Sequence, residues 1–264
     1  MQITAHAPTV LGVEIEMLSA ALDNSKINAA VTQYWRVSVV ELTESTQSDL
    51  VDAVRQGTSR TGDVIVTEYQ SAGRGRLGRS FIAPKSTALL FSFYIEPQRA
   101  RDAWGWIPLI AGVSVAQTLT EFGAKLKWPN DILVKDKKIS GLIAETTELG
   151  VVIGIGINVA MQNSELPVEN VTSLLIEGAK LITRNLLLAE VLKRFEANFT
   201  RWDCGSDEIR ATYLALSATI GQEVRVEYPD GRTETAVAQS ISGTGELVLD
   251  NGTHVNAGDI IHLR

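Results

Sequence analysis

The chain has 264 residues, of which 45% are hydrophobic and 21% charged, and these proportions exclude a disordered or collagen-like protein. Its net charge of -7 argues against bulk binding of duplex DNA, although a local basic cluster could still bind a phosphorylated small molecule. The single cysteine, Cys204, excludes an internal disulfide and a cysteine-rich zinc site, and we expect no bound transition metal.

A weakly patterned stretch precedes the first predicted strand. Within residues 1–34, only residues 13–22 are predicted to form a helix, which Asn24 and Ser25 would end. Residues 37–42 are rich in β-branched side chains and are predicted to form a strand.

A helix is predicted directly after this strand. Ser45 or Thr46 would cap its N-terminus, and Gly57 would occupy the C′ position just past its end. The apolar stripe between the two ends consists of Leu50, Val51 and Val54.

The middle of the chain predicts a sheet with helices around it. Strands are expected at residues 63–69, 87–95, 125–128, 132–134, 139–145 and 151–158. The run 87–95 is apolar nearly throughout and is therefore placed at the centre of the sheet. The short connections between the last four strands indicate antiparallel neighbours. Helices are expected at residues 106–122, 185–202 and 209–216, and residues 161–173 are expected to form a loop.

The pattern changes after Ile220, where five short strands alternate with turn signals. These strands are predicted at residues 223–228, 234–241, 246–249, 253–256 and 260–263, an arrangement typical of a small closed β-barrel. We therefore predict an α+β fold, in which a mostly antiparallel mixed sheet flanked by helices precedes a small barrel. The expected division is an N-terminal helical extension (1–34), a large domain (35–217) and the barrel (218–264).

The most informative segment is a glycine–arginine loop at residues 70–79. Its glycines are Gly73, Gly75 and Gly78, and its arginines are Arg74, Arg76 and Arg79. Glycine lets the backbone approach a ligand closely, and arginine supplies forked donors that match phosphate and carboxylate oxygens. This chemistry suits a nucleotide or an acyl phosphate. The alternative is a flexible surface loop whose arginines are merely solvated.

A second group of charged residues lies on a predicted hairpin. Lys127, Asp131 and Lys138 could converge across it, because strand residues at even spacing share a face. An ionised Asp131 beside lysines could hold a metal ion or steer an incoming amine. The alternative is a plain turn at Pro129-Asn130-Asp131 with solvated lysines around it.

A third feature is the pair of glycines inside the apolar strand 151–158. Gly154 and Gly156 would leave room for a ligand or for another backbone, and Asn158 at the strand end offers both donors and an acceptor. The alternative is close packing against a helix.

Taken together and in this order, these segments make the chain resemble the biotin protein ligases. The matching residues are Glu44-Ser45-Thr46-Gln47, the run from Glu68 to Arg79, Lys127-Trp128-Pro129-Asn130-Asp131, Lys138-Ile139-Ser140-Gly141 and Gly154-Ile155-Gly156-Ile157-Asn158. The similarity spans about residues 36–264. It implies a core like that of the class II synthetases, which binds biotin and ATP, and an SH3-like barrel after it.

The resemblance implies a reaction in two steps, with biotin and ATP as substrates and Mg²⁺ as cofactor. The biotin carboxylate would attack the α-phosphate of ATP, giving biotinyl-5′-adenylate and pyrophosphate. A lysine amine on the biotin carboxyl carrier domain of a carboxylase would then take the biotinyl group and release AMP. Two anions must meet in the first step, so fixed positive charge is required. The available cations are Arg74, Arg76, Arg79, Lys127 and Lys138.

The site residues implied by the resemblance fall into three groups. Biotin binding is implied for Ser45, Thr46, Gln47, Gln70, Gly73, Arg74, Gly75, Lys138, Gly141 and Gly154. Binding of ATP or of the adenylate is implied for Arg74, Arg76, Arg79, Phe81, Lys127, Asn130, Asp131 and Asn158. Catalysis is implied for Lys138, Asp131 and Arg76, and Asp131 is also the candidate for binding Mg²⁺ or for guiding the carrier lysine. The glycine–arginine loop is expected to order over the adenylate and to shield it from water.

Two residues depart from the usual pattern of the family. Gln47 stands where the family usually has Asn, and Phe81 stands where it usually has Trp, which removes an indole N–H donor. Neither change touches the charged centre, so we expect an effect on affinity and none on the type of reaction.

Two other functions are compatible with the same residues. A lipoate–protein ligase would share the core architecture, but the full glycine–arginine loop favours biotin. A non-catalytic biotin-sensing regulator is the second alternative, and the presence of Lys127, Asp131 and Lys138 argues against it.

Location and partners complete the expectations. The apolar runs are shorter than the roughly 20 residues that a membrane-spanning helix needs, and the N-terminus lacks the pattern of a signal peptide, so a cytoplasmic protein is expected. Only 34 residues precede the core, fewer than a helix-turn-helix domain needs, so no DNA binding is expected. Pairing of two subunits through an edge strand is possible, which leaves a homodimer open.

Overall fold

The N-terminal part of the structure, a computed structural model, contains two short helices. The structure describes residues 10–180 and 182–263, so residues 1–9 of the predicted extension and residue 264 of the predicted barrel lie outside the described residues. Helix α1 spans Val10–Leu18 and α2 spans Asn24–Ala30. The prediction of one helix over residues 13–22, ended by Asn24 and Ser25, is wrong. Asp23 caps a new helix instead, because its carboxylate accepts the backbone N–H groups of Ser25 and Lys26.

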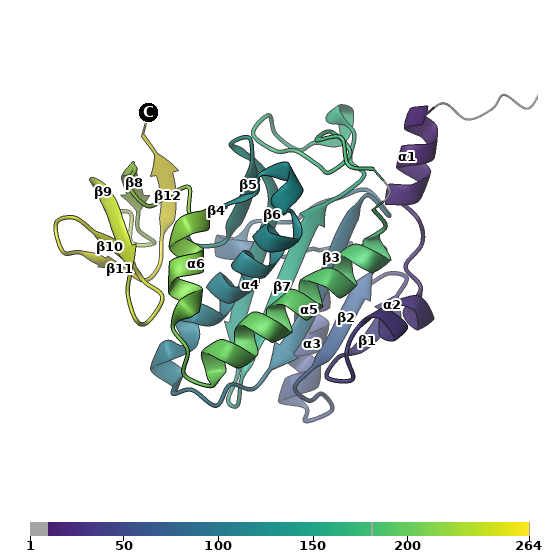
Figure 1. Ribbon diagram of the computed structural model, residues 1–264, viewed down its shortest axis with the longest axis horizontal. Helices are drawn as coiled ribbons and strands as arrows, with labels where there is room; N and C mark the ends of the chain where they lie inside the picture. Colours follow the sequence, from purple (N-terminus) through teal and green to yellow (C-terminus); the bar gives the residue numbers. More distant parts are fainter. Residues whose placement is uncertain (1–9, 181, 264) are drawn as a thin grey trace, which may run out of the picture.

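A seven-stranded mixed sheet forms the centre of the molecule (Figure 1). Its strands, in order across the sheet, are β1 (Arg36–Val40), β2 (Asp63–Thr67), β3 (Ala88–Ile95), β7 (Val151–Asn158), β6 (Lys137–Thr146), β5 (Asp131–Val134) and β4 (Lys125–Lys127). Strands β1 and β2 are parallel, and every other neighbouring pair is antiparallel. The predicted fold class is confirmed. Strand β3 lies inside the sheet and is buried along its whole length, as its apolar sequence predicts.

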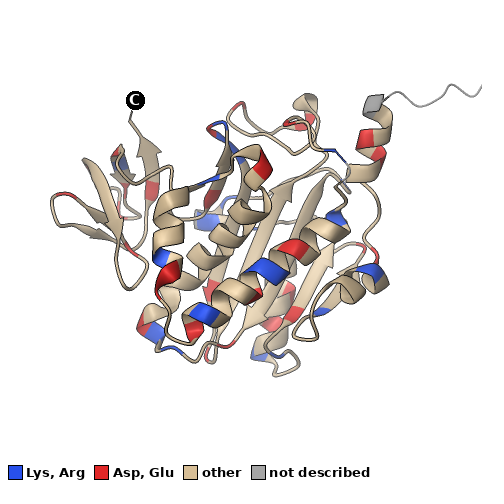
Figure 2. Ribbon diagram, in the orientation of Figure 1, with Lys and Arg blue, Asp and Glu red and all other residues tan. Residues whose placement is uncertain are grey.

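Helices cover one face of this sheet. In Figure 1, α4 (Trp106–Thr118) and α5 (Arg184–Asp203) lie in front of the strands, and α6 (Glu208–Leu216) lies beside α4. The main core lies between helices and sheet, where the rings of Phe93 on β3 and Phe195 on α5 are 4.6 Å apart. Short 3₁₀ helices occupy Arg101–Gly105, Thr120–Phe122 and Asn163–Glu165. Figure 2 shows basic and acidic residues mixed along α5.

The opposite face is covered only in part. Helix α3 (Thr46–Arg55) packs Leu50 and Val51 against Tyr94 of β3 and Val152 of β7. Its predicted ends are confirmed: Ser45 is the N-cap and accepts the Ser48 N–H, and Gly57 follows the C-cap with a φ of +69°. At the other end of this face, a second apolar cluster contains Ala83, Ala88, Leu90 and Met161. Between the two clusters, the described residues leave a strip of the sheet uncovered.

The C-terminal part forms a separate five-stranded antiparallel sheet, at the left of Figure 1. Its strands pair in the order β11 (His254–Val255), β10 (Leu247–Leu249), β9 (Thr233–Ile241), β8 (Glu223–Glu227) and β12 (Asp259–His262). The two parts contact each other tightly at Gly105, where an added Cβ would lie 2.1 Å from the Thr244 carbonyl oxygen. In addition, the indole N–H of Trp128 donates to the Gly245 carbonyl at 3.3 Å. Among the described residues, no helix combines the length and the apolar character that crossing a membrane requires.

Candidate active site

A cavity of about 520 Å³ opens on the uncovered strip of the large sheet. Strands β3, β6 and β7 form its floor, while the glycine–arginine loop, the turn before β5 and strand β12 contribute to its walls. The predicted site residues that line it are Ser45, Thr46, Gln47, Gln70, Arg74, Gly75, Arg76, Arg79, Phe81, Lys127, Asn130, Asp131, Lys138, Gly141, Gly154 and Asn158. Folding therefore brings segments that are far apart in the sequence to one cavity.

Gly73 is the predicted site residue that does not line the cavity. An added Cβ on Gly73 would lie 2.3 Å from the Phe81 carbonyl oxygen, and its own carbonyl accepts the Phe81 N–H at 2.8 Å. Gly73 thus lets the outgoing and returning limbs of the loop approach each other, which places the Phe81 ring over the sheet.

One end of the cavity is lined by buried polar groups at the start of α3. The Gln70 side-chain oxygen accepts the Thr46 N–H at 2.8 Å, and the hydroxyls of Thr46 and Ser92 lie 2.9 Å apart. Gln47 is only 2% exposed and donates its amide N–H to the Val152 carbonyl at 3.2 Å. Its buried side-chain oxygen Oε1 has no hydrogen-bond partner among the residues that the structure describes. A buried acceptor without a donor is costly, so this oxygen is suited to a ligand N–H.

The two glycines of β7 explain why the floor is hollow. An added Cβ on Gly154 would lie 2.7 Å from Gln47 Oε1, and one on Gly156 would lie 2.6 Å from the Phe81 ring. Both distances are below normal van der Waals contact, so any larger residue would displace these side chains. The prediction that the glycines leave room inside the strand agrees with this geometry.

The other end of the cavity is charged. Lys138 Nζ lies 2.6 Å from Asp131 Oδ1, and Lys127 is the register partner of Asp131 across the β4–β5 pair. An added Cβ on Gly141 would lie 2.9 Å from Lys138 Nζ, so Gly141 makes room for the ammonium group. The predicted convergence of the three charged residues is therefore found in the structure.

Each loop arginine binds a different element. Arg74 forms an ion pair with Glu145 at 2.9 Å, Arg76 donates to the Asn130 side-chain oxygen at 3.2 Å, and Arg79 pairs with Asp259 of β12. Burial lowers the pKa of Arg76, and the negative charges of Asp259 and Asp131 oppose this shift. The alternative of merely solvated arginines is therefore wrong.

Asn158, at the end of β7, is held by the segment that follows it. Its amide donates to the Thr172 carbonyl at 2.9 Å, and residue 138 pairs with residue 171 of the same segment. The predicted loop at residues 161–173 thus forms a further wall of the cavity beside Lys138.

Among the lining residues that the sequence analysis missed are Ser92, Glu227 and Asp259. Ser92 could have been found, because it is the lone polar residue inside an apolar strand and is fully buried. Glu227 and Asp259 lie on surface-type strands of the C-terminal sheet, and their local sequence carries no signal that they face the cavity. Among residues 10–180 and 182–263, no group of three or more His, Cys, Asp or Glu side chains could hold a metal ion.

Comparison with known proteins reveals similarity along most of the chain. Residues 39–159 match the model of the Biotin/lipoate A/B protein ligase family, and residues 219–263 match the Biotin protein ligase C terminal domain. The Biotin--[acetyl-CoA-carboxylase] ligase of Mycobacterium tuberculosis is 36% identical over 87% of this chain and 90% of its own length. The Bifunctional ligase/repressor BirA of Salmonella typhimurium is 33% identical over 89% of this chain and 74% of its own length.

A solved structure supports the same relationship. The biotin protein ligase from Aquifex aeolicus, in complex with biotin and ATP, superposes with a TM-score of 0.72. It is 28% identical in sequence, and the match covers 86% of this chain and 98% of that one.

Proposed function

The chain belongs to the biotin protein ligase family, and from this premise we propose that it activates biotin with ATP and transfers it to a protein lysine. The Mycobacterium relative is named for biotin, and the solved structure holds biotin and ATP, so a lipoate–protein ligase is not favoured. A non-catalytic biotin sensor is also disfavoured, because the cavity keeps a charged end built from Lys138, Asp131 and Lys127.

The observation that carries the proposal is that one cavity has a polar end, at the start of α3, and a charged end, at Lys138 and Asp131. Biotin has a ureido ring, with N–H donors and a carbonyl acceptor, and a carboxylate at the far end of an alkyl chain. The unpartnered Gln47 Oε1 accepts a ureido N–H, and the hydroxyls of Ser45 and Thr46 donate to the ureido oxygen. Lys138 then binds the carboxylate at the charged end.

The other predicted biotin contacts complete this end of the cavity. Gln70 holds the start of α3 in place, and Gly154 keeps the floor open. Arg74 and the backbone at Gly75 close over the ring from the loop, and Gly73 shapes that loop without lining the cavity.

In the first step, a carboxylate oxygen of biotin attacks the α-phosphorus of ATP. The bond from that phosphorus to the β-bridging oxygen breaks, and pyrophosphate leaves. Lys138 and Arg76 offset the repulsion between the two anions, because their charges are fixed before the reactants meet. Half-burial of Arg76 strengthens its attraction to the developing charge.

The phosphates and the adenylate are bound by the remaining predicted residues. Arg79 and Lys127 face the phosphates, Asn130 and Asn158 bind the nucleotide, and the Phe81 ring covers the site. Mg²⁺ in proteins is held by one or two carboxylates together with substrate phosphates, and Asp131 fits this pattern. When bound, the ion would supply further neutralisation of phosphate charge.

In the second step, the amine of a carrier lysine attacks the carbonyl carbon of the biotinyl-adenylate. The carbon–oxygen bond to the phosphate breaks, the amide forms, AMP leaves and the amine loses a proton. Asp131 guides the incoming lysine, since its carboxylate lies beside Lys138 at the charged end and is a quarter exposed. The name of the Mycobacterium relative supports a carboxylase carrier domain as the protein substrate.

We propose that residues 35–217 carry the biotin and ATP site. Residues 218–264 would add Asp259, the ion-pair partner of Arg79, to this site. The N-terminal extension (1–34), the cytoplasmic location and the absence of DNA binding remain predictions, and a homodimer remains an open alternative. A gel shift with promoter DNA at low salt tests the DNA prediction, since a specific shift would contradict it.

The first experiment is pyrophosphate release from ATP and Mg²⁺ in the presence of biotin or of lipoate. We expect release with biotin and none above background with lipoate. If pyrophosphate is released with lipoate and not with biotin, the proposal is replaced by lipoate ligation. If neither acid causes release, the result supports the non-catalytic sensor.

A further inference from the structure

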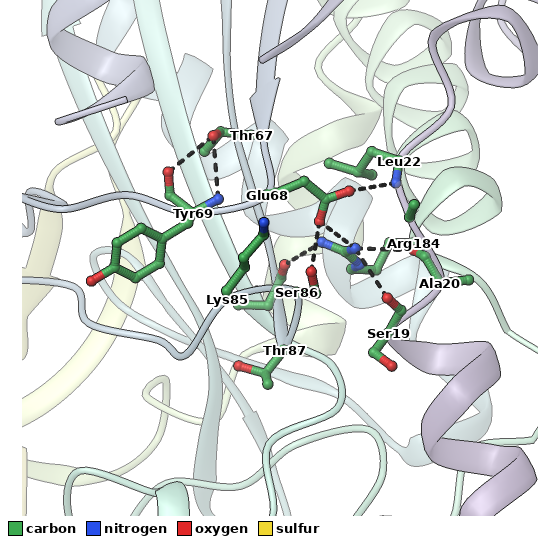
Figure 3. A network of polar contacts seen from close by, with 12 residues as sticks. Ser19, Ala20, Leu22, Thr67, Glu68, Tyr69, Lys85, Ser86, Thr87 and Arg184 are labelled. Carbon is green, nitrogen blue, oxygen red and sulfur yellow. Dashed lines mark hydrogen bonds and ion pairs between the residues drawn. The ribbon is translucent and has the colours of Figure 1, made fainter. Parts of the chain in front are cut away.

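A buried ion pair lies outside the cavity, at the base of the connection that carries the glycine–arginine loop (Figure 3). This connection, residues 68–87, leaves the sheet after β2 and returns to it at β3. Glu68 is 5% exposed and Arg184, the first residue of α5, is 0% exposed. Arg184 Nη2 lies 2.5 Å from Glu68 Oε2.

The pair holds both ends of the connection together. At the returning end, Ser86 donates its N–H to the Glu68 carbonyl and its hydroxyl to Glu68 Oε2, both at 3.0 Å. Ser86 has a φ of 64°, a conformation that is unfavourable for a residue with a side chain, so these bonds stabilise it. Arg184 Nη1 also donates to the carbonyl of Ala88, the first residue of β3, at 3.3 Å.

The N-terminal segment is bound by the same pair. The Leu22 N–H donates to Glu68 Oε1 at 2.6 Å, and Arg184 Nη2 donates to the Ala20 carbonyl at 3.0 Å. Burial by itself raises the pKa of Glu68, but the Leu22 N–H and the Arg184 charge lower it by more. The pKa therefore lies below its usual value, and Glu68 is ionised at neutral pH. Strand, helix, loop and N-terminal segment thus meet at one carboxylate.

The cavity begins two residues after Glu68. Gln70 lies there, and its side-chain oxygen holds the Thr46 N–H at the polar end of the cavity. Arg74 follows on the same limb, Arg76 begins the short 3₁₀ turn at the tip of the loop, and Arg79 begins the returning limb. Any loosening at Glu68 therefore moves both the biotin contacts and the residues that cover the adenylate.

We infer that Glu68, held by Arg184, is a positioning residue for the ligase reaction. It fixes the base of the connection, so that the glycine–arginine loop retains biotin and the adenylate instead of opening to solvent. Residues 19–22 contribute to this positioning, because their backbone groups form hydrogen bonds with Glu68 and Arg184. The inference rests on the proposed function where it is tested by adenylate loss and by the KM for biotin. It does not rest on that function where it is tested by protease cleavage of the loop.

The main test is Glu68→Gln, which keeps the shape of the side chain and removes its charge. Three readouts report on the loop: trypsin cleavage after Arg74, Arg76 and Arg79, the rate of adenylate loss from the enzyme, and the KM for biotin. We expect each to rise about tenfold, the change that corresponds to about 1.4 kcal/mol and to the loss of one hydrogen bond to a charged group. The kcat should fall much less.

The matched control is Asp63→Asn, at the opposite end of β2. Asp63 forms an ion pair with Arg36 at 2.7 Å and accepts the Arg60 N–H at 2.9 Å, far from the loop base. This variant should lower the melting temperature and leave the three loop readouts unchanged. If Glu68→Gln behaves in the same way, the pair has only a structural role and the inference is overturned.

A second variant, Ser86→Ala, removes one bond at the returning end and leaves the ion pair intact. It should raise trypsin cleavage about threefold, and it decides the matter if Glu68→Gln does not fold. Unchanged cleavage in Ser86→Ala would then overturn the inference. Cleavage is measured without substrates, so it tests the inference even if the wild-type protein forms no adenylate, a result that would refute the proposed function alone.

Discussion

Lys138→Ala is the substitution that tests the charged end of the cavity most sharply. Lys138 Nζ lies 2.6 Å from Asp131 Oδ1, and the side chain is 34% exposed. A fixed charge about 4 Å from an anion is worth about 4 kcal/mol at an effective dielectric constant of about 20. Partial exposure reduces this value, so we expect adenylate formation to slow about 100- to 1000-fold.

The fold should survive this change. The ion pair with Asp131 is partly exposed, and such pairs contribute about 1 kcal/mol or less to stability. For a chain of this size the melting temperature should fall by about 4 °C at most. The loss of activity is therefore separable from unfolding.

The assay is isotope exchange between pyrophosphate and ATP at saturating biotin. Lys137→Ala is the matched control, because Lys137 is the neighbouring residue of β6 and is exposed. It should exchange at close to the wild-type rate. A near-normal rate in Lys138→Ala, or an equal loss in Lys137→Ala, would refute the role given to Lys138.

Three further predictions follow from single contacts. Gly154→Ala would place a Cβ 2.7 Å from Gln47 Oε1 and should raise the KM for biotin at least about tenfold in steady-state kinetics, while an unchanged KM would contradict the assigned ureido contact. Asp259→Asn frees Arg79 from its exposed ion pair, so the KM for ATP should fall up to about fivefold, and a rise would show that Asp259 helps binding. Burial and the nearby Lys127 lower the pKa of His262 below 6.5 in the folded state. The neutral ring therefore stabilises the fold above pH 6.5, and this contribution is lost as the pH falls through the folded pKa. Melting curves between pH 7 and 5 should show a smaller loss of stability in His262→Gln than in wild type, and parallel losses would exclude this role.

The sequence predicted the parts of the site that depend on local pattern. Short connections identified the antiparallel hairpin, and strand spacing then brought Lys127, Asp131 and Lys138 together, as observed. Likewise, two glycines in an apolar strand indicated a hollow, and the floor at Gly154 and Gly156 is hollow. Both inferences need only the geometry of one strand and its neighbour.

What could not be predicted depends on contacts between distant segments. Arg79 and Asp259 are 180 residues apart, and Glu68 and Arg184 are 116 apart. No local periodicity encodes such pairs, and the N-terminal arginine of an amphipathic helix looks like a surface residue. The error at Asn24 and Ser25 has a local cause, because polar residues of this kind are favourable both after one helix and at the start of the next.

The most direct test of the central claim is the mass of a biotin carboxyl carrier domain after incubation with the protein, ATP and Mg²⁺. Biotin and lipoate are offered together in equal amounts. The account predicts that the carrier gains one biotinyl group on a single lysine and that no gain occurs without ATP. A carrier that gains a lipoyl group, or none, would contradict it.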